Sequence, residues 1–339
     1  MSTLIGTLKR SALASPLLVA HRRFRSSRSV KDIAEIRAGR PVGDGEIVSV
    51  SVMRNEMLRL PDFFRHYRAL GLEKFIVIDN GSTDGTREFL LDQPDVDLYS
   101  CLAPYPNSHF GIYWSTGLLR RLGIRGWVLQ VDADEHLVYD GCERLGLADL
   151  VRLLEDSGRR SLPTMMLDMY PLGPISDAAP GPDDRLVDIC PLFDADGYRL
   201  LEKSRRWEVP RLRHYAGGPR ERLFSDSRRT FHCELAKTPL VRWDPGATYI
   251  HGHSVYPFDL NFGAPTGSLL HFKLMKDFHD RARDAVSQLN HYAGSIEYRQ
   301  YMARLDQEPG LSAAFEGSRR YQDSRSLIDA GLMTPIDWR

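Results

Sequence analysis

The sequence lacks long apolar runs, cysteine motifs and an excess of charge of either sign. No stretch approaches 18 consecutive apolar residues, so we expect no membrane-spanning helix. The four cysteines lie far apart in 339 residues and form no C-x-x-C pair, which argues against a zinc knuckle and favours free thiols in a reducing compartment. Lys plus Arg equals Asp plus Glu, at 45 each, so the whole chain offers no electrostatic reason to bind nucleic acid.

Basic residues are nevertheless concentrated at the N-terminus. Residues 1–40 hold nine Lys or Arg against two acidic residues, with the short apolar patch SALASPLLVA inside them. That patch is too short, and too closely followed by Arg, for a cleaved export signal. Two interpretations stay open for this arm: a solvated tail, or a weakly amphipathic segment that contacts anionic lipid.

Strands alternating with helices follow the arm. Residues 47–53, 74–78 and 127–131 have the apolar, β-branched character of buried strands, and residues 61–70 have helical spacing. A strand–helix–strand unit of this length implies parallel pairing. We therefore expect an α/β fold, in which ligands bind beyond the carboxyl ends of the strands.

The pattern is looser in the second half of the chain. After about residue 170 the sequence is rich in Pro, Gly, Asp and Arg. Strands are expected again over 239–256 and a helix over 269–290. No internal repeat interrupts this organisation.

Two aspartates follow the strand at 127–131. Along an extended backbone alternate side chains point the same way, so Asp132 and Asp134 can present their carboxylates to one point. Clustered hard oxygen ligands suit Mg²⁺ or Mn²⁺, which keep positions open for phosphate oxygens. The alternative is an acidic turn that is simply solvated at the strand end.

The turn NGSTDGT follows the strand at 74–78 and is expected at the same edge of the sheet. It carries neither the G-x-G-x-x-G motif of dinucleotide-binding folds nor the G-K-[ST] of a P-loop, so both of those sites are excluded. Ordinary helix capping is the alternative explanation for this turn.

Several motifs together resemble a known family. S-V-M-R-N-E (51–56), F-I-V-I-D-N-G-S-T-D-G-T (75–86) and L-Q-V-D-A-D-E (129–135) resemble, in order and spacing, the nucleotide-sugar domain of family-2-like glycosyltransferases with the GT-A fold. G-G-P-R-E-R-L-F (217–224), K-T-P-L-V-R-W (237–243) and L-L-H-F-K (269–273) resemble a bacterial branch of that superfamily. The resemblance runs from about residue 47 to 330.

The resemblance implies a donor pocket and a metal site. Asp132 and Asp134 would hold Mn²⁺ or Mg²⁺, and His271 would supply a third ligand. The donor-binding residues would be Arg54, Asn55, Glu56, Asp79 and Asn80, together with the cations Arg220, Arg222 and Lys237. One departure is the pair Asp79–Asn80, where the family usually has two aspartates. Surface salt bridges for the cations, and a satisfied histidine beside Phe272 for His271, are the alternatives.

Family-2 members invert the anomeric centre, which implies a carboxylate base. Asp168, Asp194 and Glu221 are the candidates, and Asp168 is preferred because it ends an apolar strand. His251 and His253 alternate on an expected strand; we rank both below His271 as metal ligands, and expect His253 to pack or to form a hydrogen bond.

The sequence thus predicts a GT-A-type α/β fold: a central, mostly parallel sheet flanked by helices, plus an irregular α+β acceptor-side region. We expect a basic arm at 1–45, a single domain at 46–330 with halves 46–160 and 161–330, and a tail at 331–339. The expected function is transfer of a sugar from a nucleotide-diphosphate donor to a saccharide or lipid-linked acceptor. The expected location is cytoplasmic, with peripheral contact at the inner face of the membrane through residues 1–40. A divalent-metal phosphohydrolase and a non-catalytic nucleotide-sugar-binding protein remain as alternatives.

Overall fold

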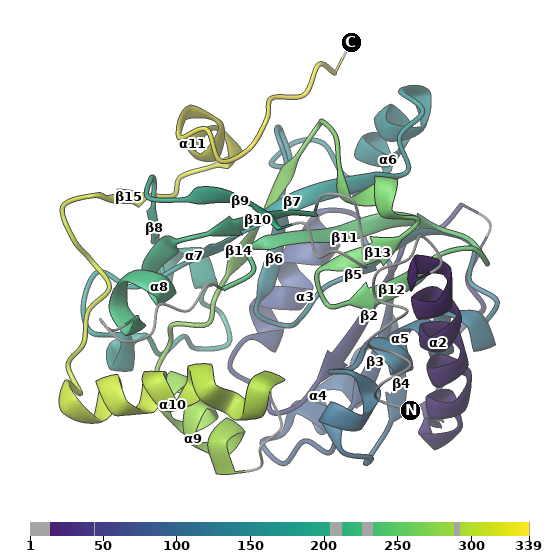
Figure 1. The fold of residues 1–339 in the computed structure, drawn as a ribbon, viewed down its shortest axis with the longest axis horizontal. Helices are drawn as coiled ribbons and strands as arrows, with labels where there is room; N and C mark the ends of the chain where they lie inside the picture. The colour runs from purple at the N-terminus through teal and green to yellow at the C-terminus, as the bar shows by residue number, and fades with distance from the viewer. Residues whose placement is uncertain (1–13, 44, 204–211, 226–232, 288–291, 339) are drawn as a thin grey trace.

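A nine-stranded sheet forms the centre of the molecule (Figure 1). The computed structural model describes residues 14–43, 45–203, 212–225, 233–287 and 292–338. The strand order is β1 (Ala34–Arg37), β4 (Val96–Ser100), β3 (Lys74–Asp79), β2 (Val48–Met53), β5 (Gly126–Gln130), β11 (Ala236–Trp243), β7 (Ser161–Asp168), β14 (Gly267–His271) and β6 (Glu135–Val138).

Six of these nine strands run in one direction. Strands β4, β3, β2 and β5 pair in parallel, β7 pairs in parallel with β14, and the antiparallel β11 joins the two groups. Strands β1 and β6 are antiparallel at the two ends of the sheet. The carboxyl ends of β2, β3, β5, β7 and β14 therefore lie along one edge, where β11 and β6 begin.

Helices cover both faces of the sheet. On one face α3 (Leu60–Ala69), α4 (Thr86–Leu91) and α6 (Leu147–Asp156) pack in the largest apolar cluster. On the other face α5 (Ile112–Arg121) packs against β2 and β5, and α2 (Ala14–Ser29) lies along α5. Helix α3 begins near Pro61, which suits a first helical turn, and Gly71 at φ 84° ends it.

The remaining elements lie outside the nine-stranded sheet, and some of them enclose a third apolar cluster. They are α7 (Leu186–Ile189), β8 (Leu192–Asp194), β9 (Arg199–Lys203), β10 (Leu212–Ala216), α8 (Gly218–Phe224), β12 (Thr248–His251), β13 (Ser254–Tyr256), α9 (Phe278–Ser287), α10 (Tyr292–Gln307), β15 (Ser318–Arg320) and α11 (Ser324–Asp329). The 3-10 helices are η1 (Val30–Asp32), η2 (Tyr105–Ser108), η3 (Ile175–Asp177) and η4 (Phe258–Asn261).

The α/β class with a central sheet between helices is confirmed. The expected helix over 269–290 is wrong at its start, because residues 267–271 form β14 inside the sheet. Part of the basic arm is folded onto the domain: Arg22 donates a hydrogen bond to the Tyr113 hydroxyl, and Arg23 to Thr248. At the other end of the chain, Met333 and Ile336 are buried.

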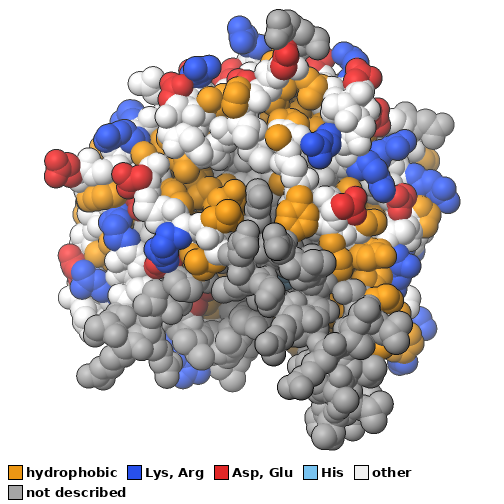
Figure 2. All heavy atoms as spheres, turned by 45° about the horizontal axis from the view of Figure 1, so that its top comes forward, with side chains coloured by type: hydrophobic (Ala, Val, Ile, Leu, Met, Phe, Trp, Pro, Cys, Tyr) orange, Lys and Arg blue, Asp and Glu red, His pale blue; other side chains and the backbone are white. Residues whose placement is uncertain are grey.

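On the coloured part of the face in Figure 2, Lys and Arg side chains are interspersed with Asp and Glu, with apolar patches between them. This agrees with the balanced composition. Within the described ranges, no helix is long and apolar enough to cross a membrane. All four cysteines are free, and three of them are buried.

Candidate active site at the carboxyl ends of the strands

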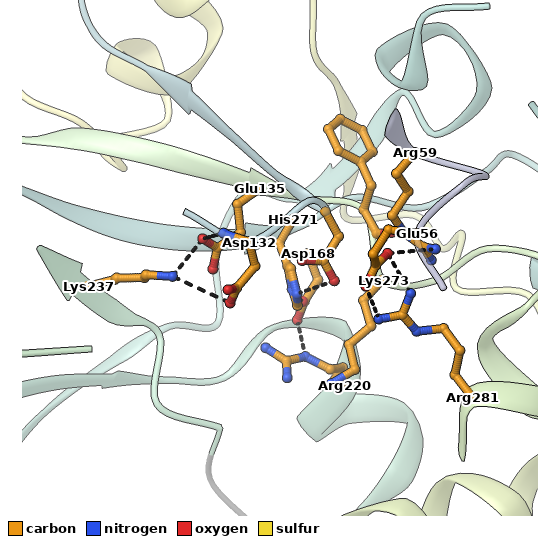
Figure 3. Close-up of polar contacts among 12 residues, drawn as sticks. Glu56, Arg59, Asp132, Glu135, Asp168, Arg220, Lys237, His271, Lys273 and Arg281 are labelled. Atoms are coloured by element: carbon orange, nitrogen blue, oxygen red, sulfur yellow. Dashed lines mark hydrogen bonds and ion pairs between the residues drawn. The ribbon is translucent and has the colours of Figure 1, made fainter. Parts of the chain in front are cut away.

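A chain of charged side chains crosses the sheet edge (Figure 3). Asp134 follows β5, Asp168 ends β7 and His271 ends β14. His271 Nε2 lies 3.3 Å from Asp134 Oδ2, and Nδ1 donates to Asp168 Oδ1 at 2.6 Å. Arg220, from α8, donates from Nε to Asp168 Oδ2 at 2.7 Å. Asp134, Arg220 and His271 lie in three separate motifs of the sequence and Asp168 lies outside them, and the fold brings all four into one contact chain.

Charge pairing governs the protonation of this chain. Burial by itself would raise the pKa of Asp168, but the charges of Arg220 and His271 outweigh it and hold that pKa below the usual range. Burial would also lower the pKa of His271, but Asp134 and Asp168 raise it. The pKa of Asp134 is lowered because His271 outweighs its burial. The imidazole therefore lies between two anionic carboxylates, one of which, Asp168, is also paired with the Arg220 guanidinium.

Asp132 has different neighbours from Asp134. Strand β5 ends at Gln130, and the amide of Glu135 donates to Asp132 O at 3.1 Å, so the two aspartates lie in a turn rather than on an extended strand. Lys237 Nζ lies 3.6 Å from Asp132 Oδ2 and donates to Glu135 Oε2 at 2.6 Å. Asp132 keeps 49% of its side chain exposed, whereas Glu135 is buried, and this burial raises the pKa of Glu135 to about 7.

The oxygen and nitrogen atoms at this edge match part of a divalent-cation site. In the described ranges, no three His, Cys, Asp or Glu side chains are arranged as a complete metal site. Asp134 and His271 nevertheless place a carboxylate oxygen and an imidazole nitrogen side by side, and Asp168 fixes the ring as outer carboxylates do for ligating histidines. Two protein ligands with open positions fit Mg²⁺ or Mn²⁺ shared with phosphate oxygens.

The turns after β2 and β3 interlock. Asn55 adopts φ 55°, and its Oδ1 accepts a hydrogen bond from the Thr83 amide at 2.8 Å. Asn80 donates from Nδ2 to the carbonyls of Cys101 and Ala103, so it ties the turn to β4. Asp79 Oδ1 accepts from the Ser82 amide at 3.0 Å, whereas its Oδ2 is buried and has no hydrogen-bond partner among the residues that the structure describes. A buried carboxylate oxygen without a donor is a place for a ligand N–H or O–H group.

Glu56 is enclosed by arginines that sequence reasoning missed. Arg281 of α9 donates both Nη atoms to its two oxygens at 2.7 Å. Arg59 Nη1 lies 3.6 Å from Glu56 Oε2. The same guanidinium makes a bidentate contact with Asp277, through Nη1 and Nη2. No motif marks Arg59 or Arg281 in the sequence, because single arginines on helices are common surface residues. Arg54, in contrast, is exposed.

The remaining expected site residues lie on the β8–α8 side. Arg222 Nη2 donates to Asp194 Oδ1 at 3.0 Å, and the Tyr170 hydroxyl donates to the same oxygen at 2.6 Å. Glu221 accepts from Arg199 Nη2 at 2.5 Å. These contacts pair the expected residues with neighbours outside the Asp134–His271–Asp168–Arg220 chain.

A further cation, Lys273, stands two residues after His271. Its Nζ donates to the Tyr298 hydroxyl at 3.0 Å and lies 4.8 Å from the centre of the same ring. Tyr298 belongs to α10, and Glu297 of that helix lies 3.5 Å from Arg220 Nη1. Lys273 lies in the quoted motif L-L-H-F-K, which is the signal that could have identified it.

Comparisons with known proteins leave the family open. No protein-family model and no curated protein matches the chain. Among solved structures, S. aureus TarS is similar over 37% of this chain and 21% of its own length, at 15% identity and a TM-score of 0.27, so the chain spans about a fifth of TarS. The mannosyltransferase PcManGT from Pyrobaculum calidifontis, solved with GDP-Man and Mn²⁺, is similar over 97% of this chain and 90% of its own, at 14% identity and a TM-score of 0.33.

The third solved structure is a 4-diphosphocytidyl-2C-methyl-D-erythritol synthase, at 11% identity and a TM-score of 0.26, over 85% of this chain and 99% of its own. All three TM-scores are too low for any of these likenesses to support a conclusion about this chain. The account of its chemistry therefore depends on its own residues.

Proposed function

We propose that the chain is a metal-dependent glycosyltransferase. It moves a sugar from a nucleotide-diphosphate donor to a saccharide or lipid-linked acceptor, with inversion at the anomeric carbon. The observation that carries the proposal is the Asp134–His271–Asp168 contact chain at the carboxyl ends of β5, β14 and β7. The ordered motif resemblance to family-2-like glycosyltransferases of the GT-A fold supports it.

In this proposal Asp134 and His271 would hold the divalent ion. Asp132, which is half exposed beside them, would add a second carboxylate at the same edge of the sheet. The bound ion supplies Lewis-acid stabilisation of the negative charge that grows on the leaving diphosphate. Lys237 holds Asp132 and Glu135 in place, since its ammonium group contacts both carboxylates. Arg220 and Lys273 add positive charge on the side of the edge towards α8 and α10.

Among the residues of the proposed donor pocket, Asp79 has a carboxylate oxygen that is available to recognise the donor. Its unpartnered Oδ2 can accept a hydrogen bond from a base N–H or a ribose hydroxyl. Asn55 shapes the pocket by holding the turns after β2 and β3 together, and Asn80 by bonding the second turn to the backbone that follows β4.

Asp168 receives a different role in this proposal from the base expected by sequence. It is 1% exposed, and its two oxygens are occupied by His271 and Arg220. A carboxylate in that position orients the imidazole rather than meeting an acceptor hydroxyl. Asp194 and Glu221 are likewise engaged by Arg222 and Arg199. The proposal therefore names Asp168 as a positioning residue.

The Asp134→Ala variant tests the proposal. A thermal-shift screen of nucleotide sugars with and without Mn²⁺ should find a donor that stabilises the wild type only with metal, since a ligand bound to the native state raises its apparent stability. Asp134→Ala should lose that shift, whereas Asp156→Ala, at an exposed carboxylate on α6, should keep it. An undiminished donor shift in Asp134→Ala would remove the metal role.

Acceptor dependence distinguishes the alternatives. A glycosyltransferase releases nucleotide faster when a suitable acceptor is present. A phosphohydrolase turns over equally without acceptor, and a binding protein shows no turnover with any acceptor. Measuring nucleotide release across an acceptor panel therefore separates the three functions.

We also propose that the protein works at the cytoplasmic face of the membrane, through its N-terminal arm. Helix α2 keeps Leu17 and Phe24 more than half exposed, and Arg25 and Arg28 are exposed on the same helix. Exposed apolar side chains beside basic residues are the composition of a helix that rests on an anionic lipid surface.

A further inference from the structure

A cavity of about 460 Å³ lies next to the sheet edge that carries Asp132 and Lys237. Its walls come from β7, β11, β13, η4, β14 and the chain after α11. Its volume falls within the range of roughly 300–1,000 Å³ that is usual for small-molecule sites. Its lining includes Lys237, His253, Tyr215, Thr238, Ser254 and Asn261. The donor-pocket turns after β2 and β3 contribute none of the described lining residues, so the cavity is separate from that pocket.

The lining combines apolar side chains with neutral polar ones, and its charged members among the described residues are Lys237 and Glu234. Hydroxyl groups that can still accept hydrogen bonds come from Thr238 and Ser254, and Tyr215 supplies an aromatic wall, whereas the Asn261 amide is already bonded within the protein. Among the described residues that line it, Lys237 is the one Lys or Arg, and its ammonium group is already engaged by Glu135 and Asp132. A site of this kind offers an anionic phosphate little, whereas neutral hydroxyl groups find donors, acceptors and an aromatic surface.

His253 adds an acceptor whose chemistry is fixed by its contacts. Its Nδ1 lies 3.0 Å from the carbonyl oxygen of Ala236, and a carbonyl only accepts, so Nδ1 carries the proton. Burial lowers the pKa of His253 and keeps the ring neutral, which leaves a lone pair on Nε2. Within the described part of the chain, Nε2 makes no hydrogen bond, and His253 lines the cavity.

The cavity also adjoins the reaction edge. Lys237 lines it and, through the same side chain, reaches Asp132 Oδ2 at 3.6 Å. A ligand in the cavity therefore lies next to the residues that face the donor diphosphate in the proposed reaction.

We propose that this cavity binds a neutral saccharide, with His253 Nε2 accepting a hydrogen bond from a sugar hydroxyl and Tyr215 forming the aromatic wall. Its role as the acceptor site rests on the proposed glycosyltransferase function. The saccharide-binding site itself does not, because it needs neither donor nor metal. Asn261 and Thr238, which hydrogen-bond to one another at 3.3 Å, hold the cavity wall formed by η4 and β11.

Equilibrium binding to the full chain, without donor or metal, tests the inference. Saturation-transfer NMR with neutral oligosaccharides of glucose, galactose, mannose, rhamnose, N-acetylglucosamine and N-acetylgalactosamine should identify at least one ligand, and inorganic pyrophosphate should not displace it. His253→Phe should weaken its affinity roughly fivefold to tenfold, the value of one hydrogen bond. Tyr215→Leu should weaken it by a similar factor, since stacking is lost.

Matched controls locate the effect. His279→Phe changes a histidine on α9 that pairs with Asp306, outside the cavity, and should leave saccharide affinity unchanged. Melting temperatures show whether each variant is folded. If His253→Phe does not fold, Tyr215→Leu still tests the site. The inference is overturned if no oligosaccharide binds, if pyrophosphate competes, or if both cavity variants bind as the wild type does.

The same experiment separates this inference from the proposed function. Saccharide binding that survives in Asp134→Ala supports a distinct site. If saccharides bind and no nucleotide sugar does, the proposed function fails and the cavity site stands. If a nucleotide sugar binds with Mn²⁺ and no saccharide does, the cavity site alone fails.

Discussion

Buried ion pairs define the site at the scale of single residues. Arg59 is fully buried, and it donates through two nitrogens to Asp277 at 2.7 and 2.9 Å and through Nε to the carbonyl of Phe272. That carbonyl belongs to the residue next to His271, so the pair positions the chain that carries the imidazole. Removing one partner from such a pair leaves the other charge without compensation.

The Asp277→Asn variant should therefore lose about 2 kcal/mol of stability at neutral pH. Burial by itself would raise the pKa of Asp277, but the charge and hydrogen bonds of Arg59 outweigh it and lower that pKa. The stabilising contribution is then fully present above the unfolded-state pKa of about 4, and is lost as the pH falls through the lower folded-state pKa. Urea unfolding at several pH values between 7 and 3 measures this difference.

The gap between wild type and Asp277→Asn should narrow as the solution is acidified below about pH 4. Asp280→Asn, at an exposed carboxylate on the same helix, is the control and should change stability little at any pH. A gap that stays constant down to pH 3 would contradict the assignment of this ion pair.

The sequence indicated Asp134 through its motif after a strand, Asp168 through its place at the end of an apolar strand, and His271 through the family resemblance. It did not reach Arg59 or Arg281, since nothing local distinguishes a buried arginine from a solvated one. Asp132 and Asp134 would point the same way only on an extended backbone. The strand ends at Gln130, before either residue. Their partners, Lys237 and His271, come from β11 and β14 and depend on the tertiary fold.

At the scale of elements, α2 and α5 approach each other closely through a glycine. A Cβ atom on Gly117 of α5 would lie 2.6 Å from the carbonyl oxygen of Ser26 on α2 and 2.9 Å from Val30 Cβ. Small residues at helix crossings permit such contact. The arm therefore packs on the domain through backbone contact as well as through Arg22 and Arg23.

The Gly117→Ala variant should destabilise the protein, although alanine in an isolated helix would be favoured by about 1 kcal/mol. The added methyl group meets backbone that cannot move without separating the helices. Thermal unfolding of the wild type and of Gly117→Ala measures the sign of this change in stability. A higher melting temperature for Gly117→Ala would show that α2 does not pack as described.

The outer side of α2 should contact anionic lipid. The full chain is expected to sediment with vesicles containing phosphatidylserine, and less so at high salt, because screening weakens the attraction of its arginines. Leu17→Ser combined with Phe24→Ser should reduce sedimentation, since both side chains are exposed. Leu200→Ser, at an exposed leucine on β9, is the control. Equal sedimentation by all three proteins would remove the lipid contact.

Element boundaries followed the sequence well in the first half of the chain and less well in the second. Residues 47–53 and 74–78 are strands as expected, because β-branched runs bounded by turn residues are specific. The last three residues of β14 (269–271) were expected to begin a helix, because a strand that is buried on both faces shows no polar–apolar alternation. Buried strands and buried helices cannot be distinguished by periodicity alone.

At the scale of the whole molecule, the fold gathers ligating and charged groups at one edge. Six strands share a direction, so their carboxyl ends meet, and the reversed β11 inserts Lys237 between them. The α/β class could be inferred from alternating elements. The nine-stranded order could not, because β11, β14 and β6 join the sheet through long-range pairing that leaves no local signal.

The most direct measurement of the central claim is the position of a metal. Crystals of the full chain grown with Mn²⁺ and a nucleoside diphosphate, measured for manganese anomalous scattering, should place the ion on the Asp134 carboxylate and His271 Nε2, with diphosphate oxygens in its remaining positions. A nucleotide bound at the Asp79 turn with manganese elsewhere, or with no manganese at all, would contradict the account.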